Sequence, residues 1–376
     1  MEYRILVINP GSTSTKVAVY QNEHNIFSET ISHSAEKLAA FSTIGDQSLF
    51  RYQAVAGLPE IQGYERGLHA VVGRGGFMKP LTSGVYRINS QMIEDIKKPL
   101  HQHASNLGVL IAVEMAEKLN IPAFVVDPVV VDELQQVARI AGHKDFERKS
   151  FFHPLNHKAT ARKMAVALNT EYERMSCIVA HMGGGITIGA HYRGRAIDVN
   201  NGLDGEAPFS PERSGALPVG DVIRMCFSGK YSESEMLKKV TGQGGIVSYL
   251  GTNDLRIVEQ MAKTNELASL LLDAMAYQVA KAIGAAAVVL DGRVDGIALT
   301  GGIAFSKRIT DYIEKKVCFI APVFLYPGES EMEALALGAL RALKGEEECM
   351  CYPNPPVEGA KENDAIRRER QYGSVF

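Results

Sequence analysis

Short apolar runs separated by polar turns open two similar passages of the chain. Residues 5–8 are apolar, residues 9–16 are small or polar, and residues 17–20 are mostly apolar again. Apolar runs of this length between turn-forming residues are typical of buried strands. The same order of apolar run, glycine-rich turn and apolar run returns at 178–191. Each passage therefore predicts a strand, a polar turn and a returning strand.

The two passages match in kind when the sequence is shifted by 172 residues. The shift places Val7 on Val179, Gly11 on Gly183, Ala18 on Ala190 and Tyr20 on Tyr192. Such self-similarity predicts a duplicated domain. A chance match between two short passages is the alternative that these residues leave open.

Helical patterns alternate with further strands along the rest of the chain. Apolar residues recur at helical spacing over 105–119, 156–168, 265–290 and 332–343, and strands are predicted at 124–126 and 296–299. This alternation indicates α/β units rather than an all-α or all-β fold. We expect one domain over 1–150, a second over 151–345 and a charged tail over 346–376. The helix from about residue 331 is expected to return to the first domain.

Composition limits the partners that the chain can have. The 376 residues are 46% hydrophobic and carry a net charge of −3, which suits two domains of ordinary size. No basic field is available for a nucleic acid or an anionic membrane, so neither is expected as a partner. No apolar run approaches the ~18–20 residues of a membrane span. With no apparent signal peptide and five scattered cysteines, a cytoplasmic protein with free thiols is expected.

Three glycine-rich or polar turns have the composition to bind phosphate. The sequence lacks the P-loop and the G-x-G-x-x-G motif. The turns 9–16, 181–185 and 300–302 nevertheless each follow a predicted strand. Glycine lets the main chain approach an anion closely, and backbone N–H groups can then cradle phosphate oxygens. A simple tight turn is the alternative for each turn taken alone.

Charged residues at strand ends form a second group of candidates. Arg74 follows an apolar strand and is flanked by glycines, and Arg213 precedes Ser214-Gly215. A guanidinium in such a loop can bind a carboxylate or a phosphate in bidentate fashion. Asp127 ends a strand just before a proline, where functional carboxylates and turn caps are both common. Ordinary structural roles remain open for all three.

Histidines and glutamates are weaker metal candidates. His101 and His103 are two residues apart, and His153 and His157 are four apart, but neither pair has an H-E-x-x-H context or a cysteine partner. We therefore expect these histidines to cap or pack rather than to bind zinc. The glutamates 329, 331 and 333 precede or open a helix, where acidic residues usually favour the helix dipole.

Taken together, the motifs resemble the acetokinase family. Residues 9–16 resemble the family's N-terminal signature N-x-G-S-[ST]-S-x-K. The resemblance continues in the family's order through Arg74, His103–Asn106, Asp127, Phe152–His153, His181–Gly185, Arg213–Gly215 and Thr300–Ile303. It spans nearly the whole chain. Residues 125–133 and 198–215 most resemble the branch of the family that acts on butyrate, with acetate or propionate as the alternative substrate.

The resemblance implies a fold and a reaction. The fold would be two duplicated ribonuclease H-like α/β domains, as in sugar kinases, actin and heat-shock ATPases, around an interdomain nucleotide cleft. The reaction would be reversible transfer of the γ-phosphoryl group of ATP to a short-chain carboxylate, giving an acyl phosphate and ADP, with Mg²⁺. The resemblance also implies a homo-oligomer. A non-catalytic, ATP-switched module of the same superfamily is the rival hypothesis.

Residue roles follow from the resemblance, position by position. Arg74, Asp127, His153 and Arg213 would be catalytic, and the acid would lie against Arg74, Gly76, His103 and Phe152. Asn9 and Glu331 would hold the metal. The nucleotide would be bound by Ser12, Ser14, Lys16, His181, Gly183, Gly184, Gly185, Asp254, Arg256, Gly301, Gly302 and Ile303. The missing side chain of Gly76 would leave room for an acyl chain longer than acetate.

Overall fold

The chain folds into two compact units. The computed structural model describes residues 1–98, 103–203 and 205–353. Unit 1 comprises Met1–Asp132 together with the described residues from Ser330 onward, and unit 2 comprises Glu133–Glu329. Residues 354–376 of the predicted tail lie outside the described residues.

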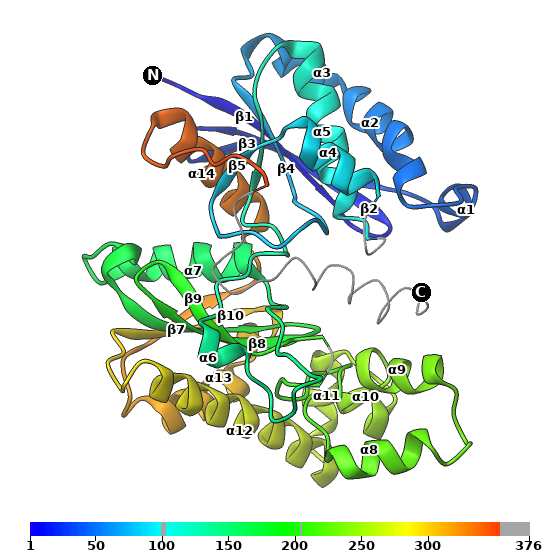
Figure 1. Cartoon of the computed structure of the whole chain (residues 1–376), viewed down its shortest axis with the longest axis vertical. Coiled ribbons are helices and arrows are strands. Elements are labelled where there is room, and N and C mark those ends of the chain that lie inside the picture. The colour runs from blue at the N-terminus through cyan, green and yellow to red at the C-terminus, as the bar shows by residue number, and fades with distance from the viewer. Residues whose placement is uncertain (99–102, 204, 354–376) are drawn as a thin grey trace. The chain divides into compact units, whose positions relative to one another are not determined.

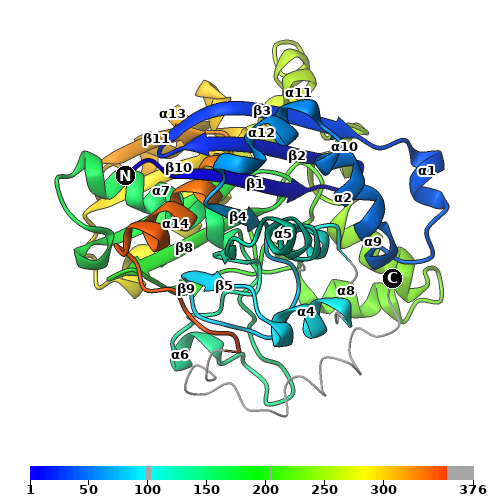
Figure 2. The same ribbon diagram turned by 90° about the horizontal axis from the view of Figure 1, so that it is seen from above.

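Unit 1 is built on a six-stranded sheet in the order β3-β2-β1-β4-β6-β5. Its strands are β1 (Arg4–Pro10), β2 (Ser14–Gln21), β3 (His24–Ser32), β4 (Ala70–Gly73), β5 (Val85–Arg87) and β6 (Ala123–Val126). β1, β4 and β6 run parallel, and the other strands pair antiparallel with their neighbours. Figure 2 shows β3, β2 and β1 side by side.

Helices cover both faces of this sheet. They are α1 (Ala35–Ala39), α2 (Ser48–Ala56), α3 (Pro59–Tyr64), α4 (Ser90–Lys97), α5 (Asn106–Leu119) and α14 (Glu331–Lys344), with short 3₁₀ turns at Gly45–Gln47 and Glu65–Gly67. α5 and α14 both pack on β1, β4 and β6 and lie on opposite sides of them (Figure 1). The strands are therefore buried on both faces, which explains their unbroken apolar runs.

Unit 2 repeats this plan with a five-stranded sheet in the order β11-β10-β7-β8-β9. Its strands are β7 (Ser176–Met182), β8 (Ile186–Tyr192), β9 (Arg195–Val199), β10 (Gly296–Gly301) and β11 (Val323–Pro327). The order matches β6-β4-β1-β2-β3 of unit 1. Shifted by 172 residues, the bounds of β1 coincide with those of β7, and the start of β2 coincides with that of β8. The predicted duplication is confirmed.

The helices of unit 2 also cover both faces of their sheet. They are α6 (Gln136–Arg139), α7 (Pro154–Ala167), α8 (Val219–Cys226), α9 (Glu233–Thr241), α10 (Gly245–Leu250), α11 (Leu255–Met261), α12 (Glu266–Val289) and α13 (Lys307–Val317), with 3₁₀ turns at Tyr172–Arg174 and Gly302–Phe305. α12 and α13 lie on one side and α7 on the other (Figure 1). The four predicted helices are confirmed as α5, α7, α12 and α14.

Within the described ranges, α12 alone is long and apolar enough by length and composition to cross a membrane. Its inner face, which includes Leu272, Met275 and Val279, is buried in the core of unit 2. The core helix of a globular domain passes the same test of length and composition, so the test alone does not indicate a membrane span.

Residues 133–150 group with unit 2, whereas the sequence placed the boundary near residue 150. The amide of Gln135 donates to the carbonyl of Ile197 at 3.0 Å. Arg148 donates to the Asp198 carboxylate at 3.0 Å and to the Val199 carbonyl at 3.3 Å. These bonds attach the segment to β9. The charged side chain of Arg148 therefore forms long-range contacts within unit 2.

A buried ion pair holds the start of this segment. Lys158 on α7 donates to the Glu133 carboxylate at 2.6 Å and to the Gly194 carbonyl at 2.7 Å. The same carboxylate accepts the amide of Ala196 at 2.7 Å. The two charged side chains are 0% and 4% exposed. An ammonium buried this deeply needs its counter-charge.

We predict that Glu133→Gln lowers the free energy of unfolding of unit 2 by about 3–5 kcal/mol, because it leaves the Lys158 ammonium buried without a counter-charge. Urea unfolding followed by circular dichroism measures this, since the chain has no tryptophan. The control is Asp311→Asn, which breaks the exposed Lys307–Asp311 pair and should cost about 0.5 kcal/mol or less. Equal costs for the two variants would contradict the prediction.

Candidate active site

In unit 1 the candidate residues stand at the carboxyl ends of parallel strands. Asn9 lies at the end of β1, Arg74 follows β4 directly, and Asp127 follows β6 directly. Parallel neighbouring strands end at the same edge of a sheet, where α/β proteins bind their ligands. The topology therefore brings these three predicted residues to one edge of unit 1.

Glu331 joins Asn9 and Arg74 at this edge. The side-chain amide of Asn9 donates to the Glu331 carboxylate at 2.6 Å. An Nη of Arg74 is in a close ion pair with the other carboxylate oxygen. Glu331 is the first residue of α14, so the packing of that helix on β1 and β4 delivers the carboxylate.

The structure places the three neighbouring glutamates differently, and the resemblance assigned only Glu331 to the metal. Glu331 contacts Asn9, whereas Glu329 lies 3.3 Å from the His181 imidazole in unit 2. Burial, and after it the negative charge of Glu333, raises the pKa of Tyr20 on β2. Glu333 therefore lies near β2. Of the three, Glu331 is the one hydrogen-bonded to the predicted metal ligand Asn9.

The carboxylate of Asp127 is held in a fixed orientation. It is 3% exposed and accepts hydrogen bonds from the Ser83 hydroxyl at 2.5 Å and from the Gly84 amide at 2.9 Å. Its backbone has a φ of +40°, which is uncommon for a residue with a side chain. Strained backbone of this kind clusters at functional sites. The sequence did not identify Ser83, which no motif marks.

Arg51, which no sequence motif marks, is hydrogen-bonded to the first polar turn, residues 9–16. Arg51 is 1% exposed and donates to the carbonyls of Gly11 at 2.7 Å, Ser14 at 2.9 Å and Ser12 at 2.9 Å. Arg51 and the buried Val55 are one helical turn apart on α2. That spacing, which puts an arginine on the apolar face of a helix, is the signal that could have identified it.

The predicted nucleotide ligands of the same turn face outward. Ser12 and Lys16 are exposed, and Ser14 is partly buried. Lys16 lies directly across the hairpin from Asn9 in the β1–β2 register. The positive charge of Lys16 is therefore close to the edge that carries Asn9.

His103 lies beside Arg74 as a neutral imidazole. Burial, and then the charge of Arg74, lowers the pKa of His103. Its Nδ1 accepts the amide of Ser105 at 3.2 Å, and its ring meets Phe77 edge-on with centroids 5.7 Å apart. His101, the other histidine of that pair, lies outside the described residues.

The interpretation that Gly76 leaves room for an acyl chain is wrong. A Cβ at Gly76 would lie 2.5 Å from the Cα of Asn106 and 2.7 Å from its amide nitrogen. Asn106 begins α5 and accepts the amide of Phe77 at 2.8 Å on its side-chain oxygen. The start of α5 fills the space beside Gly76. Only a glycine lets the turn pack this closely on the helix.

In unit 2, three turns meet at the carboxyl ends of β7, β10 and β11. Gly301 has a φ of +88°, and a Cβ there would lie 2.3 Å from the Met182 carbonyl oxygen. Gly301 and Gly328 exchange two backbone hydrogen bonds, at 3.1 and 3.0 Å. The turn 183–185 after β7 therefore lies next to those after β10 and β11. Gly302 is exposed, whereas Ile303 is buried.

His153, His181 and Glu329 form a cluster at this edge. Their ligand atoms lie within 4.8 Å of one another, the one such group of potential metal ligands among the residues that the structure describes. The two imidazoles are stacked with centroids 4.7 Å apart, and His181 Nδ1 is 2.8 Å from the side-chain oxygen of Asn156. His153 also caps α7, as predicted for these histidines.

His157 packs inside unit 2. It is completely buried and forms hydrogen bonds with the Thr187 hydroxyl at 2.8 Å and with His191 at 3.2 Å. Burial lowers the pKa of both histidines well below the usual value, so both are neutral at pH 7. The prediction that His157 packs rather than binds a metal together with His153 agrees with these contacts.

Arg213 is brought against the turn after β7. Its guanidinium donates to the Gly202 carbonyl at 2.6 Å, and a Cβ at Gly185 would lie 2.1 Å from one of its nitrogens. The Ser210 hydroxyl donates to the Gly184 carbonyl at 2.5 Å and accepts the amide of Arg213 at 3.0 Å. Ser210, which no motif marked, thus ties two segments that the sequence predicted separately.

Asp254 and Arg256 pair with each other at the start of α11. The Asp254 carboxylate caps the helix by accepting the amide of Arg256 at 2.9 Å, and it binds the guanidinium at 2.6 Å. Hydrogen bonding from Arg256 lowers the pKa of Asp254 to about 2. The neighbouring Asn253 donates to Glu212 at 2.9 Å, which links this turn to the loop of Arg213.

Phe152, predicted to contact the acid, packs edge-on against His157 in unit 2.

Two units with matching strand orders and polar turns at their strand ends define a duplicated α/β protein. The chain is similar in structure to acetate kinase from Porphyromonas gingivalis, with a TM-score of 0.74, 20% identity, and coverage of 91% of this chain and 100% of that one. It is also similar to a propionate kinase from Francisella tularensis, with a TM-score of 0.66, 20% identity, and coverage of 89% and 98%.

The sequence comparisons narrow this class to one family. Residues 89–317 match the model of the acetokinase family. The chain is 52% identical over 355 residues to butyrate kinase 2 from Clostridium acetobutylicum. The aligned residues cover 94% of this chain and 100% of that protein. The chain belongs to the acetokinase family and is an ATP-dependent carboxylate kinase.

We predict that Gly76→Val destabilises unit 1 by about 1–3 kcal/mol, because the added side chain would overlap the start of α5. Activity should fall in parallel for all acids. The measurements are urea unfolding and kcat/KM for acetate and butyrate. The control is Gly63→Val, because Gly63 lies in α3 with open space around a Cβ. A stable Gly76→Val protein with a selective gain for acetate would contradict the prediction.

Proposed function

We propose that this chain transfers the γ-phosphoryl group of ATP to butyrate, reversibly, giving butyryl phosphate and ADP, with isobutyrate as a second acid. The observation that supports butyrate is the 52% identity to butyrate kinase 2 over that protein's whole length. The acetate and propionate kinases, at 20% identity, support the fold alone. Acetate or propionate is therefore the second candidate substrate.

The chemical difficulty is the meeting of two anions rather than the removal of a proton. A short-chain acid titrates near the side-chain carboxyls, at ~4–5, and is an anion at pH 7. One pair of like charges at ~4 Å and an effective dielectric of ~20 costs about 4 kcal/mol. With a net charge of −3 over the whole chain, the attraction must come from local cations.

Arg74 is proposed to anchor the acid, and it already binds a carboxylate. Its guanidinium pairs with Glu331, so a substrate carboxylate would take a place of the same chemical type. His103, neutral and beside Arg74, and Phe77, packed on His103, offer an apolar flank for an alkyl chain. Gly76 and Phe152 are proposed to shape the surroundings of this site.

Phosphoryl transfer is proposed to be direct and in line. A carboxylate oxygen forms a bond to the γ-phosphorus while the bond from that phosphorus to the β,γ-bridging oxygen breaks, and ADP leaves with the electron pair. The transition state is loose, and catalysis rests on position and charge. Arg213 and His153 are proposed to donate to the transferring oxygens, and Asp127 to orient groups rather than to take a proton.

The nucleotide is proposed to lie along the polar turns. Backbone N–H groups at Gly184, Gly185 and Gly302 are proposed to meet phosphate oxygens. The N–H groups of Gly183 and Gly301 donate to the carbonyls of Gly185 and Gly328, so these two glycines are proposed to let the phosphates approach the turns closely. The remaining proposed ligands of the nucleotide are Ser12, Ser14, Lys16, His181, Asp254, Arg256 and Ile303. Unit 1 would thus bind mainly the acid and unit 2 mainly the nucleotide.

Asn9 and Glu331 are proposed to hold Mg²⁺. Their side chains contact each other at 2.6 Å and offer amide and carboxylate oxygens, the hard ligands that Mg²⁺ takes together with substrate phosphates. The donor set therefore fits the ion. Bound there, Mg²⁺ would neutralise charge on the phosphates. We also propose a cytoplasmic location, self-association, and no nucleic-acid or membrane partner.

The proposed activity predicts an acyl phosphate that hydroxylamine traps as a hydroxamate. With ATP and Mg²⁺, a series of acids from acetate to valerate should give the highest kcat/KM for butyrate. Highest activity with acetate or propionate would support the second candidate. ATP consumption without hydroxamate would indicate hydrolysis, and absence of both would favour a non-catalytic, ATP-switched module.

We predict that Arg213→Ala lowers kcat by a factor of about 10³–10⁵, the range for an arginine that stabilises transferring phosphate, with little change in KM. Arg74→Ala should mainly raise the KM for the acid, since it removes ground-state anchoring. Steady-state kinetics with each substrate varied separates the two effects. The control is Arg224→Ala, at an exposed arginine on α8. A loss of less than tenfold for Arg213→Ala would remove it from the mechanism.

A further inference from the structure

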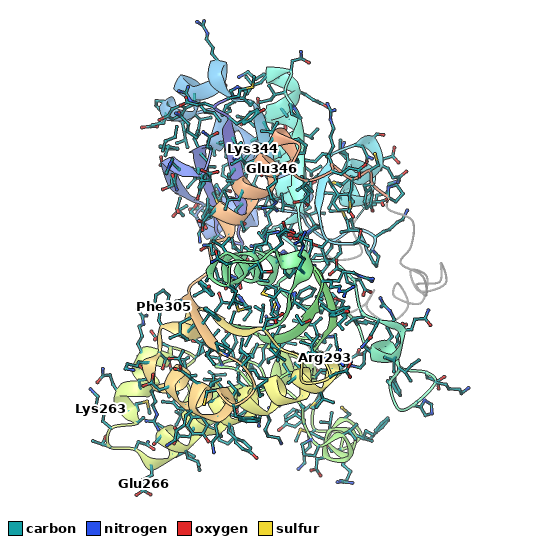
Figure 3. All side chains as sticks on the ribbon, turned by 90° about the vertical axis from the view of Figure 1, so that its left-hand side faces the viewer. Lys263, Glu266, Arg293, Phe305, Lys344 and Glu346 are labelled. Carbon is teal, nitrogen blue, oxygen red and sulfur yellow. The ribbon has the colours of Figure 1, made fainter. Side chains whose placement is uncertain are left out.

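The chain after α14 continues as a short arm of unit 1. α14 ends at Lys344, and residues 346–352 form no helix and no strand apart from one bridge to β5. We call residues 346–352 the C-terminal arm. In Figure 3, Lys344 and Glu346 mark the point at which α14 ends and the arm begins. Arg341 on α14 donates to the Glu347 carboxylate at 2.7 Å, which attaches the start of the arm to the helix.

The middle of the arm pairs with the edge of the sheet. The amide of Met350 donates to the Val85 carbonyl at 2.8 Å, and the Met350 carbonyl accepts the amide of Arg87 at 3.4 Å. β5 is the last strand in the order of the sheet, and an unpaired edge strand can pair with other chains. Covering this edge is the simplest role for the arm, and it would require only the backbone of the arm.

Tyr352 anchors the far end of the arm. Tyr352 is 3% exposed, and its hydroxyl donates to the Asp95 carboxylate at 2.5 Å and accepts the amide of Lys79 at 3.1 Å. The Tyr352 carbonyl accepts the side-chain amide of Asn89 at 2.5 Å. Burial, and after it the hydrogen bond to Asp95, raises the pKa of Tyr352, so the hydroxyl keeps its proton at neutral pH. The contact with Lys79 fixes the start of the loop 79–84.

The Met350 side chain lies against the end of the same loop. The Thr82 hydroxyl donates to the Met350 sulfur at 3.7 Å, and a Cβ at Gly84 would lie 3.2 Å from that sulfur. The loop 79–84 is therefore held at its start by Tyr352 and at its end by Met350.

The loop held by the arm is also the loop that orients Asp127. Ser83 and Gly84 follow Thr82 and donate to the Asp127 carboxylate at 2.5 and 2.9 Å. The amide of Asp127 donates to the Gly84 carbonyl at 3.1 Å. Asp127 has a φ of +40°, and strained backbone of this kind persists only where the surrounding structure over-determines it. The arm supplies part of that surrounding structure.

α14 adds two contacts between the same segment of chain and the candidate site. Its first residue, Glu331, contacts Asn9 at 2.6 Å. Its Gly338 packs on β6, where a Cβ would lie 2.5 Å from a methyl carbon of Val126, the residue before Asp127. The helix and the arm together thus contact a proposed metal ligand, the strand that leads to Asp127 and the loop that orients its carboxylate.

We propose that Met350 and Tyr352 are positioning residues for phosphoryl transfer, which fix the loop 79–84 and through it the orientation of the Asp127 carboxylate. The proposal rests on the proposed role of Asp127 in the reaction. A displacement of about 1 Å at a reacting centre can cost about 10²-fold in rate, so loosening the loop should lower kcat. The KM values should change little, because Asp127 is proposed to act on the transfer step rather than on binding.

The first test compares Met350→Ala with Met350→Leu. Both variants keep the backbone pairing that covers β5, but only leucine keeps a side chain of similar volume against Gly84. Met350→Ala should lower kcat by about tenfold or more, with the KM values for ATP and butyrate within about twofold of wild type, and Met350→Leu should restore most of the loss. Hydroxamate formation with each substrate varied measures these constants, and circular dichroism with urea unfolding checks that each variant is folded.

The second variant, Tyr352→Phe, tests the same loop even if Met350→Ala does not fold. It removes only the hydroxyl that binds Asp95 and Lys79, and it should lower kcat by about fivefold or more with little change in KM. The matched control is Tyr249→Phe, at a tyrosine on α10 that is 64% exposed. This control should behave as wild type.

A double-mutant cycle tests whether the arm acts through the loop. Ser83→Ala removes the hydroxyl that orients Asp127 and should itself lower kcat by about tenfold. In that background Met350→Ala should cost about threefold or less, because the contact through which it acts is already lost. Edge coverage of β5 by the arm gives no reason for the two effects on kcat to depend on each other.

Three outcomes would overturn the proposal. These are a folded Met350→Ala or Tyr352→Phe enzyme with the kcat of the wild type, a loss in Met350→Ala that leucine does not restore, and effects of Met350→Ala and Ser83→Ala that multiply in full. A wild-type chain that gives no hydroxamate with any acid would instead refute the proposed function. An active wild type whose Asp127→Asn variant keeps its kcat would refute the role of Asp127, and this proposal with it, but not the proposed reaction.

Discussion

Close approach of the backbone at the ends of parallel strands is the constraint on which the clustered candidate residues of each unit depend. A Cβ at Gly73 would lie 2.1 Å from the Gly108 carbonyl oxygen, and one at Gly301 would lie 2.3 Å from that of Met182. A side chain at either position would separate the strand end from its neighbour. The glycines therefore serve first to let segments meet, and the functional side chains are carried by the turns that meet there.

The duplicated sheets put this constraint to different uses. In unit 1 the strand ends present side chains: Asn9, Arg74 and Asp127, with Glu331 supplied by α14. In unit 2 the corresponding ends present mainly glycine backbone, with Arg213 fastened over the turn by Ser210. Side-chain charges suit a small carboxylate, and free backbone suits phosphate oxygens. This difference underlies the proposed division of work between the two units.

In each unit a carboxylate contacts one of the side chains proposed to bind a ligand. Arg74 pairs with Glu331, and His181 contacts Glu329. The Glu331 carboxylate offsets the positive charge of Arg74 in a chain whose overall charge is close to neutral. These contacts also mean that an anionic ligand exchanges one carboxylate contact for another, so its net gain is smaller than a bare ion pair would suggest.

The sequence by itself determined the elements, the duplication and most candidates for the site. Hydrophobic periodicity is a local property, and so α5, α7, α12 and α14 and the matching hairpins could be predicted from it. The family motifs likewise marked Arg74, Asp127 and Arg213. Only the tertiary structure decided which partners these residues meet. It put Asn106 in the space beside Gly76, Arg51 beneath the first turn, and Glu331 rather than Glu329 beside Asn9. Those contacts join segments that lie from 30 to more than 300 residues apart. Packing between distant segments sets such contacts, and no local pattern along the chain carries that information.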